Sequence, residues 1–280
     1  MVKRNILIFF ILFYNVFAVN SQTSSDSLKL KKLLDSGQNL LFNQNFKEAS
    51  AVFKELKNPA KKGSFYEDYF LSEQKLIEIL IRKSLIMEAE KRALKSRLEA
   101  RELLGSSSLI EMKFLIYIGI IKQRRSEIDS AIYYYKKAAE IGLENNKEVV
   151  SNAGVALGNV GVAYGVLGDI NLQYHYNEKS YEIIKRISED NSIGLVNPII
   201  TQGNILSKKS QFVKANTKYN EALKILDVNN AKGRYYSTAL MNVGINYTLL
   251  GEFDKGYDFL YKSLKYTESI FGSIHPNLLE

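Results

Sequence analysis

Apolar residues along most of this chain recur at intervals of three and four, the spacing of one face of an α-helix. The segment 240–252, LMNVGINYTLLGE, shows the pattern most clearly. In it Gly244 is followed by Tyr247 and by a Leu-Gly pair at 250–251. The segment 157–169, LGNVGVAYGVLGD, repeats the pattern. The equivalent glycines lie about 42, 42 and 41 residues apart, at Gly119, Gly161, Gly203 and Gly244. A fixed period of this length predicts a repeat architecture.

Each period contains two apolar helical patterns separated by a turn, which predicts antiparallel helix pairs. The pairs are expected at 28–60, 64–104, 108–145, 148–190, 194–230 and 233–276. Pro59 is expected to end the first pair, because proline interrupts a helix. The second pair matches least well, since no glycine marks it. The fourth departs at Gln173 and Asn177, where a small residue and an aromatic are expected. A lone pair cannot bury both faces, so the pairs should stack.

These residues resemble the tetratricopeptide repeat. In that family a large apolar residue, a glycine or alanine, and an aromatic mark the first helix, while alanine, aromatic and alanine mark the second. The fifth pair shows the second-helix pattern with Ala215, Tyr219 and Ala222. The resemblance covers about residues 28–280, with a period near 42 instead of the usual 34. The segment 271–276, FGSIHP, is similar to the turn of the longer variant seen in kinesin light chains and bacterial arrays.

The resemblance implies an all-α fold, a right-handed superhelical α-solenoid of about six antiparallel helix pairs. The first helices of such a solenoid line a concave groove. Eight extra residues in a repeat add about 12 Å of helix, roughly one turn to each helix of a pair.

The chain begins with a pattern typical of a signal peptide. Lys3 and Arg4 precede an almost wholly apolar run at 6–19, which is short for a membrane span. We expect residues 1–21 to be a cleaved signal peptide, with cleavage after Ala18 or Ser21, and 22–27 to be a polar linker. The alternative is an uncleaved anchor. Either one predicts an exported protein, periplasmic or secreted, with no membrane span after cleavage.

Composition narrows the classes of function. There is no cysteine, which excludes disulfides, thiolate metal sites and cysteine nucleophiles. The formal charge of +8 becomes +6 without Lys3 and Arg4. This mild excess favours a solvated lysine-rich surface over an acidic partner or nucleic acid, because no dense basic cluster with a nucleic-acid motif accompanies it. Nucleic acid is therefore not expected as a partner.

No motif indicates catalysis, so the chain is not expected to be an enzyme, and neither a cofactor nor a metal is expected. The two histidines, His175 and His275, lie a hundred residues apart. His175 is expected on a helix surface and His275 in a turn.

Four glycines follow a spacing of 4, 3 and 4, which places them on one face of a helix, at Gly154, Gly158, Gly161 and Gly165. They indicate either close helix packing or a widened groove that admits a ligand. The sequon at 246–248 lies inside a predicted helix and is interpreted as a chance match.

Polar residues on the first helices are the candidates for binding. Asn159 and Asn242 directly precede the Val-Gly pair of their repeats, and Asn204 directly follows Gly203. A side-chain amide can both donate to and accept from a peptide backbone. The resemblance implies this role, because asparagines at these positions often hold the bound peptide in tetratricopeptide grooves. Lys113, Arg124 and Lys208 are expected to pair with acidic groups. The alternative is that asparagine is merely tolerated on a solvated helix face.

The sequence predicts a non-catalytic protein–protein interaction scaffold that binds an extended peptide or protein segment in the groove. Residues 277–280 are expected to begin a further helix, which indicates a truncated chain. A second hypothesis is therefore the N-terminal sensory array of a larger signalling or peptidase-like protein, with a caspase-like, kinase or DNA-binding effector. A third is a glycan binder that uses the many tyrosines.

Overall fold

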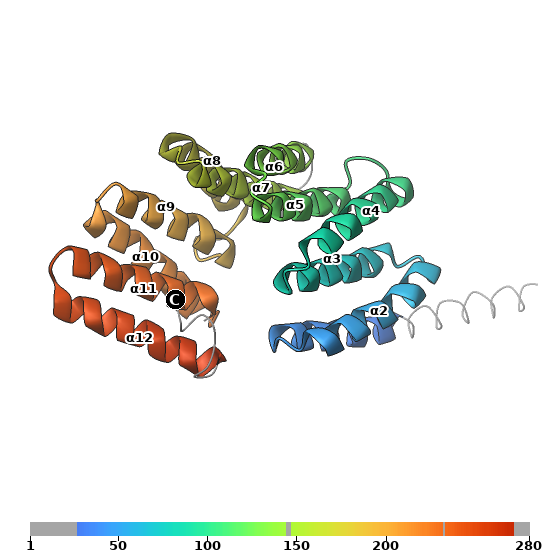
Figure 1. Ribbon diagram of the computed structural model, residues 1–280, viewed down its shortest axis with the longest axis horizontal. Coiled ribbons are helices and arrows are strands. Elements are labelled where there is room, and N and C mark those ends of the chain that lie inside the picture. Colours follow the sequence, from blue (N-terminus) through green and yellow to red (C-terminus); the bar gives the residue numbers. More distant parts are fainter. Residues whose placement is uncertain (1–26, 144–146, 232, 272–280) are drawn as a thin grey trace, which may run out of the picture. The chain divides into compact units, whose positions relative to one another are not determined.

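The computed structural model describes residues 27–143, 147–231 and 233–271, and these form helices joined by short turns (Figure 1). A helix at 27–42 is followed by α2 (Phe46–Lys62), α3 (Tyr66–Arg82), α4 (Ile86–Leu104), α5 (Leu109–Arg124), α6 (Ile128–Leu143), α7 (Lys147–Val166), α8 (Ile170–Ile187), η1 (Ile193–Leu195), α9 (Val196–Lys208), α10 (Phe212–Val228), α11 (Arg234–Leu249) and α12 (Phe253–Phe271). The described residues contain no strand. The predicted all-α fold of successive helix pairs is confirmed.

The chain divides into two compact units, Met1–Arg125 and Ser126–Glu280. The boundary is the turn between α5 and α6, so the repeat predicted at 108–145 has one helix in each unit. Within each unit consecutive helices pack on each other. The first helices of successive pairs also touch, α3 with α5 in one unit and α9 with α11 in the other. This second set of contacts is what a stacked array of pairs requires.

Glycines allow the two helices of a pair to approach closely. A Cβ added at Gly203 would lie 2.5 Å from Tyr219 Cε1, and one at Gly161 would lie 3.0 Å from the backbone oxygen of Gln173. All four glycines of α7 face α8 in this way. Their spacing therefore reflects close helix packing, and the alternative of a groove widened for a ligand is not supported.

The expectation that Pro59 ends the first pair is wrong, because α2 continues to Lys62. Pro59 stands in the last turn, where the Gly63 N–H still donates to its carbonyl at 2.9 Å, so one missing backbone donor is tolerated. Gln173 and Asn177, which depart from the repeat pattern, are both buried. Asn177 Nδ2 donates to the Pro198 carbonyl at 3.2 Å and so links α8 to α9.

Candidate functional site

Two of the predicted asparagines meet between successive repeats of the second unit. Asn242 Nδ2 on α11 donates to Asn204 Oδ1 on α9 at 3.0 Å. The Tyr219 hydroxyl donates to the same oxygen at 2.8 Å. Burial raises the pKa of Tyr219 to about 12, so this hydroxyl stays a donor at neutral pH. Tyr219 and Asn242 together therefore fix the orientation of the Asn204 amide.

The pair retains capacity for a ligand. Asn204 Oδ1 already accepts two hydrogen bonds, the number that its lone pairs allow. Among the described residues, Asn204 Nδ2 and Asn242 Oδ1 make no hydrogen bond, and both residues are half-buried. One donor and one acceptor one repeat apart match the alternation of an extended backbone, whose residues each carry one N–H and one C=O.

The other predicted site residues are more scattered. Asn159 is half-buried on α7, and Lys208 is exposed in the last turn of α9, both in the same unit as the pair. No hydrogen bond links Asn159 to the pair within the described ranges. Lys113 and Arg124 lie on α5 in the first unit, half-buried and exposed respectively. Of the six predicted residues, Asn204 and Asn242 are the two for which the described residues show a mutual hydrogen bond.

Asn246, the first residue of the sequon, is only 1% exposed. Its Nδ2 donates to Asn216 Oδ1 at 2.9 Å, and its Oδ1 accepts from Ser207 Oγ at 2.7 Å. Because both of its polar atoms are used inside the fold, this asparagine has a structural role and is inaccessible to a glycosylating enzyme. His175 is exposed, as expected, and His275 lies outside the described residues.

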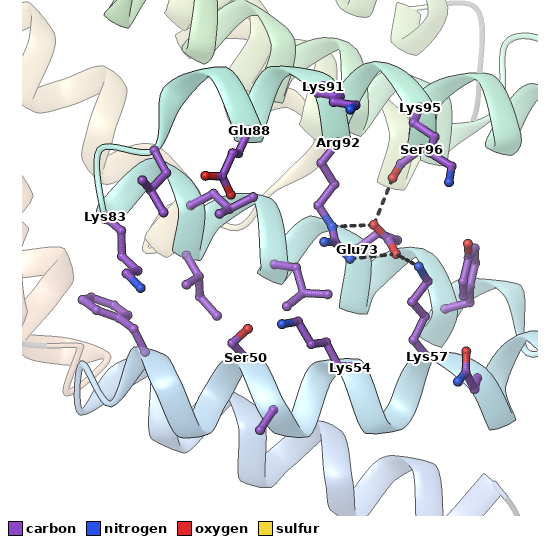
Figure 2. Close-up of a pocket in the computed structure, with 18 of the residues that line it drawn as sticks. Ser50, Lys54, Lys57, Glu73, Lys83, Glu88, Lys91, Arg92, Lys95 and Ser96 are labelled. Carbon is purple, nitrogen blue, oxygen red and sulfur yellow. Dashed lines mark hydrogen bonds and ion pairs between the residues drawn. The ribbon is translucent and has the colours of Figure 1, made fainter.

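Sequence reasoning missed a groove in the first unit, between α2 and α4 with α3 as its floor; we call it the α2–α4 groove (Figure 2). Its volume is about 1060 Å³. Eight cationic side chains and three carboxylates line it, giving a net charge of +5. The cations are Lys47, Lys54, Lys57, Lys61, Lys83, Lys91, Arg92 and Lys95, and the carboxylates are Glu73, Glu88 and Glu99.

A buried carboxylate ties the two walls of this groove together. Glu73 on α3 is 2% exposed, and it accepts from Lys57 on α2 at 2.6 Å and from Arg92 on α4 at 2.8 Å. Ser96 Oγ on α4 donates to it as well, at 3.1 Å. Burial acts to raise the pKa of Glu73, but the bonds from Lys57 and Arg92 outweigh burial and hold the pKa below its usual range. The carboxylate is therefore charged at neutral pH and joins three helices.

A second carboxylate, Glu99, also joins the helices around the groove. The Glu99 carboxylate on α4 pairs with Lys61 on α2 and accepts from the Tyr69 hydroxyl on α3 at 2.7 Å. Burial raises the pKa of Tyr69, which keeps that hydroxyl protonated. Lys57, Lys61 and Arg92 thus pair with internal carboxylates, and these pairs join the α2 wall of the groove to α3 and α4.

The spacing along the sequence carried a signal for this groove. Lys47, Lys54, Lys57 and Lys61 follow helical intervals of 7, 3 and 4, and Lys91 and Lys95 are four apart on α4. Each set lies on one helix face. The fact that α2 and α4 face one groove needed the structure.

Comparison of the structure with solved structures supports the repeat interpretation. BtubC (BKLC) from P. vanneervenii superposes with a TM-score of 0.59 at 16% identity, over 89% of this chain and 94% of that chain. A kinesin light chain from Podosopora anserina with TPR-like repeats gives 0.55 at 10% identity, over 71% and 94%. The chain has a tetratricopeptide-like fold. A Rap protein in complex with Competence and Sporulation Factor gives 0.57 at 12% identity, over 84% and 74%. No protein-family model matches this tetratricopeptide-like chain, and no curated protein matches it.

In the part of the chain that the structure describes, no group of three or more histidine or carboxylate side chains is placed to hold a metal ion. None of the described helices combines the length and apolarity that crossing a membrane requires.

Proposed function

We propose that this chain is a non-catalytic interaction scaffold that binds an extended protein segment along the first helices of its second unit, α7, α9 and α11. The observation that carries the proposal is the hydrogen-bonded pair Asn204–Asn242. Its remaining donor and acceptor lie one repeat apart and are oriented by Tyr219. Pre-oriented amides lower the entropy lost on binding, because the site does not have to be ordered by its ligand.

The surroundings of the pair favour a protein segment over a small polar molecule. Apolar side chains are also exposed on the same helices, among them Met241 and Ile245 on α11, which lie one and three residues from Asn242 in the sequence, and Val162 on α7. A peptide presents alternating backbone polar groups and side chains, which suits a surface of amides and apolar residues. The tetratricopeptide-like fold supports this interpretation, since a Rap protein of similar fold was solved in complex with Competence and Sporulation Factor.

The proposal includes export from the cytoplasm, which rests on the sequence of residues 1–21. The basic Lys3 and Arg4 before an apolar run are the features of a signal peptide. Fractionation of the native cells tests export, and recovery of the protein from the cytoplasm alone would contradict it. N-terminal sequencing then distinguishes a cleaved signal peptide from an uncleaved anchor.

The binding surface is tested with two double variants. A peptide selected by the full chain from a displayed peptide library is titrated calorimetrically against wild type and against Asn204→Ala/Asn242→Ala. We expect affinity to fall by about tenfold, the effect of roughly 1.4 kcal/mol from lost hydrogen bonds. Helicity, followed by far-ultraviolet circular dichroism, should stay unchanged.

The matched control is Asn171→Ala/Asn220→Ala, which removes the same groups from exposed positions on α8 and α10. This control should bind like wild type. Equal affinity of both double variants would remove the amides from the site, and a rise in melting temperature with soluble polysaccharide but not with peptide would favour a glycan binder.

A further inference from the structure

The α2–α4 groove lies in a different unit and on different helices from the proposed peptide surface. Five of its eight cations make no ion pair among the described residues: Lys47, Lys54, Lys83, Lys91 and Lys95. All five are exposed. Figure 2 shows Lys54 on the α2 wall and Lys91 and Lys95 on the α4 wall, with Lys83 at one end. The three carboxylates of the lining therefore leave five lysines around the groove without an ion-pair partner among the described residues.

The two walls of the groove are joined by the protein's own side chains, without a ligand. The Glu73 carboxylate links Lys57 on α2 with Arg92 and Ser96 on α4, and the Glu99 carboxylate links Lys61 with Tyr69. These side chains use their charges and hydrogen bonds on each other, so their role is to join the helices and not to bind a ligand. The unpaired lysines are then the groups that can receive an anionic ligand, and they approach one from two walls.

The end of the groove near Lys47 and Lys83 also offers apolar surface. Phe46 and Leu80 are half-buried there, and Leu85 is 38% exposed. From Lys47 to Lys61 the α2 wall is about 21 Å long at 1.5 Å per residue. An extended chain of about six residues spans that length at roughly 3.3 Å per residue.

We propose that the α2–α4 groove binds an acidic protein segment, extended along α2 and α4, whose carboxylates pair with Lys54, Lys83, Lys91 and Lys95 and whose apolar side chains contact Phe46 and Leu85. Charge complementarity selects the acidic character, since the lining has a net charge of +5. The half-exposed apolar residues at one end select a protein segment over a simple polyanion.

Single-stranded nucleic acid fits the groove less well. Binding of that kind combines phosphate contacts with aromatic faces on which successive bases stack. The aromatic residues of the groove are Phe46 and Tyr69, and Tyr69 is only 2% exposed with its hydroxyl held by Glu99. One half-buried ring cannot stack a series of bases.

The test uses fluorescence anisotropy with the full chain and three labelled probes: an octamer of glutamate and leucine in alternation, its glutamine–leucine counterpart, and an eight-nucleotide oligothymidine. We expect the glutamate–leucine peptide to bind and the neutral peptide not to bind. Raising the salt from 50 to 500 mM should weaken binding several-fold, because exposed charges are screened.

Two triple variants locate the site. Lys54→Glu/Lys91→Glu/Lys95→Glu should weaken binding of the acidic peptide by at least about tenfold, since like charges then oppose it. Lys29→Glu/Lys31→Glu/Lys32→Glu changes the net charge equally on the helix at 27–42, where these lysines are exposed, and should keep binding within about twofold. Asn204→Ala/Asn242→Ala should leave this binding unchanged, which separates a failure here from a failure of the proposed function.

Three results would overturn the proposal. They are an equal loss in both triple variants, binding of oligothymidine at least as tight as that of the acidic peptide, and the absence of binding by the acidic peptide at low salt.

Discussion

Glu73 shows how a single side chain can connect three helices of a stacked helical fold. It is a buried carboxylate, a type of group that is seldom buried without partners, and it is supported by Lys57, Arg92 and Ser96 from both neighbouring helices. The sequence alone gave no sign of its role, because the partners lie 16, 19 and 23 residues away along the chain. Asn246 is a second case, since its bonds to Ser207 and Asn216 cross between repeats.

Replacing Glu73 by glutamine should destabilise the first unit by about 2 kcal/mol at pH 7. Two cations would lose their charged partner, although the cost stays below that of a fully buried pair because Lys57 and Arg92 reach solvent. Urea unfolding followed by circular dichroism measures this, and unchanged stability would contradict the role of Glu73 as a tie. The control is Glu268→Gln on α12. Glu268 forms an ion pair with Lys265 near the protein surface, so this substitution should change the free energy of unfolding little.

The same substitution changes the acid dependence of stability. The pKa of Glu73 is lowered in the folded state, so its stabilisation is present above the ordinary value of 4.5 and is lost as pH falls through the folded pKa. The difference in stability between wild type and Glu73→Gln should therefore shrink below about pH 4.5. A difference that grows on acidification would contradict the assigned direction of the shift.

At the scale of the element, the turns within pairs share one geometry. Each passes through a residue with positive φ, at Gln44, Ser84, Ser126, Gly168, Ser210 and Gly251. In the two Leu-Gly turns, the following N–H donates five residues back, from Asp169 to Tyr164 and from Glu252 to Tyr247. Ser210 is followed by the same bond, from Gln211 to Leu206 at 2.9 Å. This is the hydrogen bond of a glycine-capped helix end, made here without glycine.

The sequence predicts a turn in every pair, but only the two Leu-Gly pairs indicate the residue that takes a positive φ. Serine and glutamine tolerate the left-handed region only with strain, so nothing in their identity announces it. Pro59 does not end α2, because a proline in the last turn removes only one hydrogen bond and the packing of α2 on α3 keeps the helix continuous.

Replacing Ser210 by glycine should stabilise the second unit by about 0.5–1 kcal/mol, because its φ of 57° strains any residue with a Cβ. The same substitution inside a regular helix, Ser50→Gly in α2, should instead cost about 0.5 kcal/mol. Thermal unfolding of the two variants and of wild type measures both changes in stability. A destabilised Ser210→Gly variant would show that the serine side chain itself supports the turn.

At the scale of the whole molecule, the period of the apolar pattern was sufficient to predict the class of fold. Helix-pair stacking depends on small and large residues at fixed spacing, which a sequence displays directly. A binding surface depends on which side chains already have hydrogen-bond or ion-pair partners inside the protein, and a sequence does not show those partners. Asn204 and Asn242 were identified by position, but their mutual hydrogen bond and the role of Tyr219 emerged only from the structure. The α2–α4 groove emerged in the same way.

The central claim is that a protein segment lies along the first helices of the second unit. It is tested most directly by placing a photo-reactive benzophenone side chain at Ile245 on α11 or, as control, at Tyr257 on α12, both exposed. Ile245 is three residues from Asn242 and shares its helix face. The selected peptide should crosslink from position 245 and not from 257, as measured by the mass of the adduct. Crosslinking from 257 alone, or equally from both positions, would contradict the account.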